Sequence, residues 1–136
     1  MPATPALAPL PLRGLRVLDL TQIYNGPHAT FLMAMAGAEV IKAEPPGGEY
    51  LRRRDGRAGA FMPFAMLNGC KKSISLNLKS DKGRDIFLSL VEGADVVAEN
   101  YSPGVMDRLG IGYDVLRQRN PRIVLASGSG YGQDGG

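Results

Sequence analysis

Short apolar runs alternate along the chain with segments whose apolar residues recur every three or four positions. The short runs predict β-strands at 16–20, 39–43, 73–77, 95–99 and 121–126. Helical spacing predicts two longer helices, one from Pro27 to Gly37 and one that Ser80 begins and Gly93 ends. Shorter helices are expected at 61–67, 106–109 and 113–119.

Strands that alternate with helices indicate βαβ units. The predicted fold class is α/β, part of a doubly wound, Rossmann-like parallel sheet flanked by helices. The chain stops within a glycine-rich stretch after the last strand, where a βαβ unit would continue into a helix. We therefore expect a truncated domain over 13–136, preceded by a flexible leader over 1–12. A long polar loop is expected at 45–59.

Glycine, proline, asparagine and serine gather after the predicted strands. Four such stretches lie at 21–27, 44–48, 99–104 and 127–136. Ligands of open parallel sheets bind outside the carboxyl ends of the strands. The sequence therefore predicts a ligand site built from these four loops.

Charge narrows the class of ligand. The net charge is +3, with basic pairs or triplets at 52–54 and 71–72, which suits a phosphorylated small molecule better than a nucleic-acid backbone. The basic residues near predicted strand ends are either a solvated surface or a phosphate-binding set; they are Lys42, Arg52 to Arg54, Lys71, Lys72 and Arg108.

Location and cofactors are constrained by what the sequence lacks. Its longest apolar stretches are too short to span a bilayer, and prolines interrupt the apolar start, so we expect neither a membrane protein nor a signal peptide. The single cysteine excludes an internal disulfide and favours the cytoplasm. Cys70 and His28 are more typical of a packed thiol and a structural histidine than of a catalytic pair. No metal-ligand cluster is visible.

One motif suggests a dinucleotide. Gly130 to Gly135 fits the pattern G-x-G-x-x-G. A dinucleotide fingerprint requires a helix after the glycines and an acidic residue about 20 positions further on, and the chain offers neither. A flexible turn is the better interpretation.

From Pro11 to its end, the sequence resembles class III CoA-transferases, the family of formyl-CoA and crotonobetainyl-CoA:carnitine transferases. Five blocks carry the resemblance in the family's order. They are LRGLRVLDLT with NGP at 12–27, AGAEVIKAEPPGG at 36–48, NGCKKSISLNLK at 68–79, ADVVAENYSPGVMDRLG at 94–110 and NPRIVLASGSGYGQ at 120–133. Lys72 stands where the family usually has arginine, which loses a bidentate contact, and Asn77 stands where it usually has aspartate.

The resemblance implies an enzyme that transfers CoA between an acyl-CoA and a carboxylic acid through a covalent aspartyl intermediate. Residues 13–136 would be the amino-terminal part of the CoA-binding large domain, and the full-length form an interlocked homodimer. The family's aspartate lies beyond Gly136, so this chain would contain no catalytic residue and be inactive alone. CoA would be a substrate and not a cofactor, with no nucleic-acid partner.

The same resemblance implies ligand-binding positions. The residues expected around the nucleotide, phosphates and pantetheine of CoA are Lys42, Glu44, Lys71, Lys72, Asn100 and Arg108. Those expected beside the acyl group and the thioester are Tyr24, Asn25, Ser129 and Gly130.

Two alternatives stay open. An α-methylacyl-CoA racemase shares the fold and moves a proton with a His/Asp pair, which would also lie past Gly136. The block at 99–104 looks more like the transferases. The second alternative is a CoA-binding module without enzymatic activity.

Overall fold

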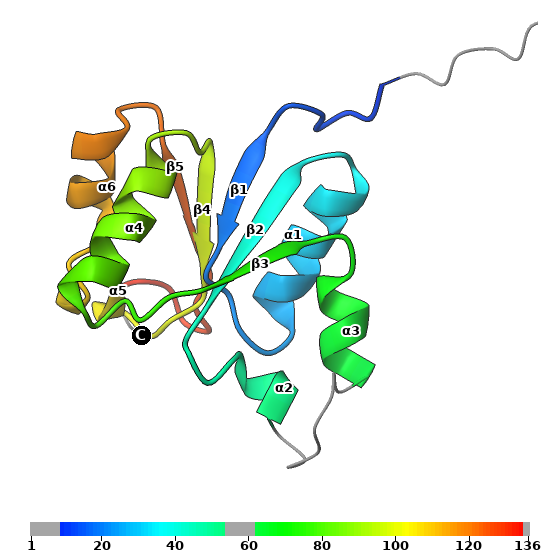
Figure 1. Cartoon of the computed structure of the whole chain (residues 1–136), viewed down its shortest axis with the longest axis horizontal. Helices are drawn as coiled ribbons and strands as arrows, with labels where there is room; N and C mark the ends of the chain where they lie inside the picture. Colours follow the sequence, from blue (N-terminus) through cyan, green and yellow to red (C-terminus); the bar gives the residue numbers. More distant parts are fainter. Residues whose placement is uncertain (1–8, 54–61, 135–136) are drawn as a thin grey trace, which may run out of the picture.

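Five parallel strands form one sheet in the computed structural model, which describes residues 9–53 and 62–134. The strand order is β3-β2-β1-β4-β5 (Figure 1). The strands are β1 (Arg16–Asp19), β2 (Glu39–Glu44), β3 (Lys72–Ser75), β4 (Val96–Glu99) and β5 (Val124–Ser127). In register, Val17 of β1 lies between Val40 of β2 and Val96 of β4. The predicted α/β fold with a doubly wound parallel sheet is confirmed.

Helices cover both faces of the sheet (Figure 1). One face carries α1 (Asn25–Met35) and α3 (Met62–Asn68), and the other carries α4 (Asp81–Val91) and α6 (Tyr113–Arg119). The short helices α2 (Tyr50–Arg53) and α5 (Val105–Arg108) lie at the edge where the strands end (Figure 1). None of the helices in the described ranges is long and apolar enough to cross a membrane.

The sheet separates two hydrophobic cores. Val17 and Val40 pack towards α1, whereas Leu18 and Leu20 pack towards α4 and α6. Alternate residues of one strand therefore enter different cores, and both faces need apolar side chains. This explains why β1 and β4 read as short continuous apolar runs, as expected of strands buried on both faces.

The predicted helix signals act as expected. The Ser80 hydroxyl accepts a hydrogen bond from the Gly83 backbone N–H at 3.2 Å and caps α4. Gly37 follows α1 with a φ of +101°, a conformation that favours glycine after a helix.

The loop predicted at 45–59 was wrong in part, because α2 lies within it. Leu51 is fully buried and anchors this helix, and the carboxylate of Glu49 accepts the Leu51 backbone N–H at 2.9 Å. Residues 54–59 of that loop, Phe61 of the helix predicted at 61–67, and residues 1–8 of the leader lie outside the described residues. Leu12 donates its backbone N–H to the Ala36 carbonyl oxygen at 2.9 Å.

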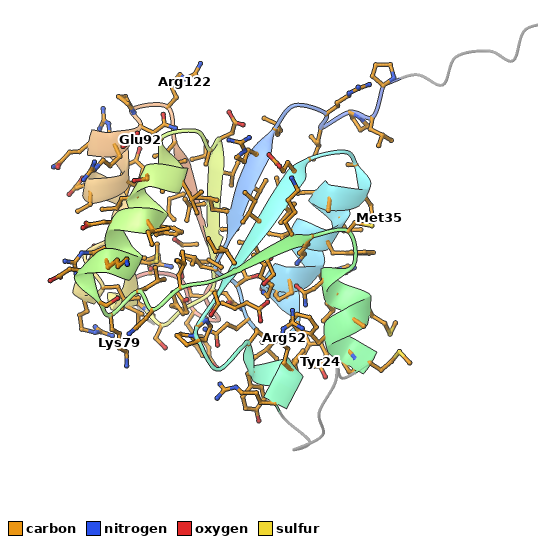
Figure 2. All side chains as sticks on the ribbon, viewed as in Figure 1. Tyr24, Met35, Arg52, Lys79, Glu92 and Arg122 are labelled. Carbon is orange, nitrogen blue, oxygen red and sulfur yellow. The ribbon has the colours of Figure 1, made fainter. Side chains whose placement is uncertain are left out.

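Helix α1 buries other residues than its apolar pattern suggests. Leu32 and Met35 are 53% and 54% exposed, and Met35 points outwards from the helix (Figure 2). The buried positions are instead Gly26, Pro27 and Thr30 near its start. Small residues there let the first turns of α1 approach the end of β1 closely.

Candidate functional site

A cleft of about 440 Å³ opens where the direction of the strand order changes. From β1 the chain moves outwards through β2 and β3, and it then returns to the other side of β1 for β4 and β5. Ligands of such sheets bind at this switch point, outside the strand ends. The switch-point cleft is lined by Asn25, by residues 100–103 and by residues 128–132. It brings together four predicted site residues, Asn25, Asn100, Ser129 and Gly130.

Asn100 holds the two central strand ends together. Its Oδ1 accepts the Gln22 backbone N–H at 2.7 Å, and its Nδ2 donates to the Gln22 carbonyl oxygen at 2.8 Å. The Leu20 N–H already donates to the Ala98 carbonyl oxygen at 2.8 Å. The side-chain amide therefore continues the pairing of β1 with β4 beyond the strands, and it fixes the wall of the cleft.

A second cavity of about 240 Å³ lies beside the cleft, and we call it the aliphatic pocket. It is lined by Gln22, residues 43–45, residues 76–79, Tyr101, Val105 and Leu109. Leu76, Leu78 and Leu109 supply apolar walls, and the exposed Lys79 is its cation. Lys79 lies at the edge where the strands end, opposite the edge that carries Glu92 and Arg122 (Figure 2). Sequence reasoning missed Lys79 as a site residue, although it closely follows β3.

Glu44, predicted near the nucleotide, lines the aliphatic pocket with a fully engaged carboxylate. Arg52 donates to both oxygens, from Nε at 2.7 Å and from Nη2 at 2.9 Å. The Ser73 hydroxyl and the Glu49 backbone N–H donate to the same carboxylate. Burial raises the pKa of Glu44, but these donors outweigh it and bring the pKa to about 2. The Arg52 guanidinium also lies 3.8 Å from the ring centre of Phe64, so Glu44 links β2 to α2 and α3.

Two of the predicted lysines converge on one buried aspartate. The Lys71 ammonium donates to Asp19 Oδ2 at 2.9 Å, and Lys42 Nζ lies 3.8 Å from the same oxygen. Hydroxyl groups of Thr21 and Thr30 also donate to this carboxylate. Burial raises the pKa of Asp19, but the two ammonium groups and the Thr21 hydroxyl lower it by more. The pKa of Asp19 therefore lies below its usual range.

Lys42 and Lys71 therefore lie beneath the site and not in it. Their side chains are 2% and 1% exposed. Lys42 donates to the Thr21 carbonyl oxygen at 2.7 Å. Lys71 also donates to the Pro27 carbonyl oxygen, the Thr30 hydroxyl and the Asn68 amide oxygen. With their ammonium groups enclosed by protein acceptors, we assign both lysines to the support of the site, in place of the direct contact expected from the sequence.

The remaining predicted residues are dispersed. Lys72 begins β3 and forms an ion pair with Glu39 at the start of β2, so it lies at the amino-end edge, away from the cleft. Arg108 is exposed on α5, next to the Val105 and Leu109 walls of the aliphatic pocket. Tyr24 is exposed at the carboxyl-end edge (Figure 2). Residues 9–53 and 62–134 contain no group of three or more side chains suited to hold a metal ion.

Comparison with known proteins identifies relatives over nearly the whole chain. Acetyl-CoA:oxalate CoA-transferase from Acetobacter aceti is 48% identical over 134 residues, which cover 97% of this chain and 34% of that protein. Formyl-CoA:oxalate CoA-transferase from Streptomyces coelicolor is 45% identical, over 90% of this chain and 30% of that protein. Succinyl-CoA:mesaconate CoA-transferase from Haloarcula marismortui is 46% identical, over 89% and 32%. The chain thus spans about a third of the length of these relatives.

Solved structures agree with this relationship. The crystal structure of Rv3272 from Mycobacterium tuberculosis matches with a TM-score of 0.86 and 42% identity, over 93% of this chain and 36% of that one. A CAIB/BAIF family protein from Brucella suis matches with a TM-score of 0.82 and 31% identity, over 95% and 36%. The sequence profile of CoA-transferase family III matches residues 12–136. The chain therefore belongs to CoA-transferase family III.

Proposed function

We propose that this chain forms part of the CoA site of an enzyme that transfers CoA between an acyl-CoA thioester and a carboxylic acid. The observation that carries the proposal is the switch-point cleft, which gathers Asn25, Asn100, Ser129 and Gly130 at one place. Transferases that share 45–48% identity with the chain use acetyl-CoA or formyl-CoA with oxalate, by their names.

The two cavities suit different parts of CoA. The aliphatic pocket has apolar walls for a flat adenine ring, and Lys79 in its lining is a partner for a phosphate group. Arg108, exposed on α5 next to the lining residue Leu109, is a second candidate for a phosphate contact. The switch-point cleft has loop backbone and the Ser129 side chain for the pantetheine and thioester end. Both cavities are lined by Tyr101, whose phenol has a pKa raised by burial and therefore stays neutral.

The covalent chemistry is proposed to lie in residues after Gly136. There, an aspartate carboxylate attacks the thioester carbon and expels the CoA thiolate, which leaves an acyl–aspartyl anhydride. The thiolate attacks the aspartyl carbonyl and releases the first acid. The acceptor carboxylate then repeats the exchange in reverse, which forms the new acyl-CoA and frees the aspartate. CoA is a substrate throughout, and no cofactor is part of the proposal.

An interlocked homodimer in the cytoplasm is also proposed for the full-length protein. Apolar side chains on the outer faces of α1 and α3 support a partner surface, because Met62 and Met66 are 69% and 66% exposed, beside exposed Leu32 and Met35.

The test is CoA binding, measured by isothermal titration calorimetry. Lys79→Met should weaken binding about tenfold or more, because a charge-assisted phosphate contact contributes roughly 1.5–3 kcal/mol. Lys72→Met is the matched control, since Lys72 lies at the other edge of the sheet, and it should leave affinity unchanged. Equal effects of the two substitutions, or no binding by the unaltered chain, would contradict the proposal.

Activity separates the transferase from a binding module. The 136-residue chain should exchange no labelled CoA between acyl-CoA and acid, because the proposed nucleophile is not in it. Exchange by this chain alone would disprove the assignment of the nucleophile to later residues.

A further inference from the structure

The turn after β1 contains a backbone conformation that is rare for its residue type. Ile23 has a φ of +68°, in the left-handed region. A β-branched residue there is a genuine outlier, because its side chain crowds the backbone. The side chain is 44% exposed, so its packing is incomplete. A specific contact with the backbone of this residue is therefore worth seeking.

Glu49 holds it. This side chain is 2% exposed, and its Oε1 accepts the Ile23 backbone N–H at 2.8 Å. Its Oε2 accepts the Leu51 backbone N–H at 2.9 Å, which fixes the carboxylate to the start of α2. The Glu49 backbone N–H donates to Glu44, itself held by Arg52. Hydrogen bonds to Leu51 and Glu44 therefore hold Glu49 in place while its carboxylate binds the Ile23 N–H.

The opposite side of the same turn is equally fixed. Gln22, the residue before Ile23, has both backbone groups paired with the Asn100 amide. Asn25, two residues after Ile23, lines the switch-point cleft. The left-handed step at Ile23 therefore decides how the chain turns from the fixed end of β1 to the cleft wall.

We propose that Glu49 is a positioning residue, which keeps Ile23 left-handed by binding its N–H and so places Asn25 in the wall of the cleft. This inference rests on the proposed function in one respect, because its consequence for ligand binding assumes that the cleft holds CoA. The conformational claim itself does not depend on CoA.

Two readouts in this chain test the proposal. The first is the amide of Ile23 by nuclear magnetic resonance, through its hydrogen exchange and its φ-dependent coupling constant. The second is CoA affinity by calorimetry. Glu49→Ala should speed exchange at Ile23 at least tenfold, shift the coupling constant away from that of positive φ, and weaken CoA binding about tenfold. Glu49→Gln keeps one acceptor oxygen, so its exchange rate at Ile23 and its CoA affinity should lie between those of the unaltered chain and Glu49→Ala.

A rescue variant separates positioning from general stability. Glycine adopts positive φ without strain, so Ile23→Gly in the Glu49→Ala background should recover most of the lost affinity. Ile23→Gly alone should bind CoA within about threefold of the unaltered chain. If Glu49→Ala does not fold, which urea unfolding shows, the same comparison is made with Glu49→Gln.

Each outcome bears on the proposal. Unchanged exchange at Ile23 in the folded Glu49 variants overturns it, and so does a loss of affinity that Ile23→Gly fails to rescue. If the unaltered chain binds no CoA, the proposed function fails, while the Ile23 amide still decides whether Glu49 holds the turn.

Discussion

Removal of the Asp19 carboxylate tests the buried charge cluster beneath the site. Asp19→Asn keeps the size of the side chain but removes the negative charge that faces two buried ammonium groups, those of Lys42 and Lys71. Asp19 is fully buried, so water cannot reach this position to solvate the ammonium groups in place of the carboxylate. The variant therefore leaves two buried positive charges close to each other and to a neutral amide.

The expected cost follows from that geometry. Loss of one partner from a buried ion pair typically destabilises a protein by about 3–5 kcal/mol, because the remaining charge is left without compensation. We expect Asp19→Asn to lose at least about 3 kcal/mol. Lys71→Met should cost less, since Lys42 and two threonine hydroxyls would still compensate the carboxylate.

Urea unfolding followed by far-ultraviolet circular dichroism measures the change, because the chain has no tryptophan to report by fluorescence. Asp85→Asn is the matched control: Asp85 is exposed on α4, and its change should stay within about 0.5 kcal/mol. The native pKa of Asp19 lies below its ordinary value of 3.8. Its stabilising effect should therefore be complete near neutral pH and be lost as the pH falls through 3.8 towards the native pKa. A loss below about 1 kcal/mol for Asp19→Asn would refute the reasoning.

Three further predictions concern the supports around the site. Gly26→Ala should destabilise by about 1–3 kcal/mol in thermal unfolding, because the added Cβ would collide with the side chain of Thr21; an unchanged melting temperature would contradict the close packing. Arg52→Met should raise the pKa of Glu44 from about 2, so stability should start to fall at a higher pH in acid titrations than it does for the unaltered chain. Ser80→Ala should cost about 1 kcal/mol by urea unfolding, as loss of a helix cap, and no change would show that the cap is dispensable.

Much of the fold was predictable because local and global signals agree. Strand β1 has an apolar centre, Val17 and Leu18, because it is buried on both faces, and α4 follows a serine that caps it. Helix α2 was missed because no apolar period marks it. It depends on one buried side chain, Leu51, and on a carboxylate from the preceding residues, which spacing along the chain does not reveal.

The position of the switch-point cleft was predictable to the level of its loops, and the roles of its residues stay predictions. Asn25, Asn100 and Ser129 follow strands, and parallel strands bring their carboxyl ends to one edge. The lysines were harder, because sequence position does not tell whether an ammonium group faces solvent or a buried partner. One signal was available: Asp19 lies within an apolar strand, and a buried carboxylate requires cations nearby.

The hydrogen bonds of the Asn100 side-chain amide restrict which residue type can replace it at position 100. It pairs with a backbone donor and a backbone acceptor of the same residue, Gln22, as a peptide group of a neighbouring strand would. Aspartate lacks the donor, serine is too short, and glutamine would displace the group by one methylene. The distance between the two central strand ends is therefore set when the chain folds, before any ligand binds.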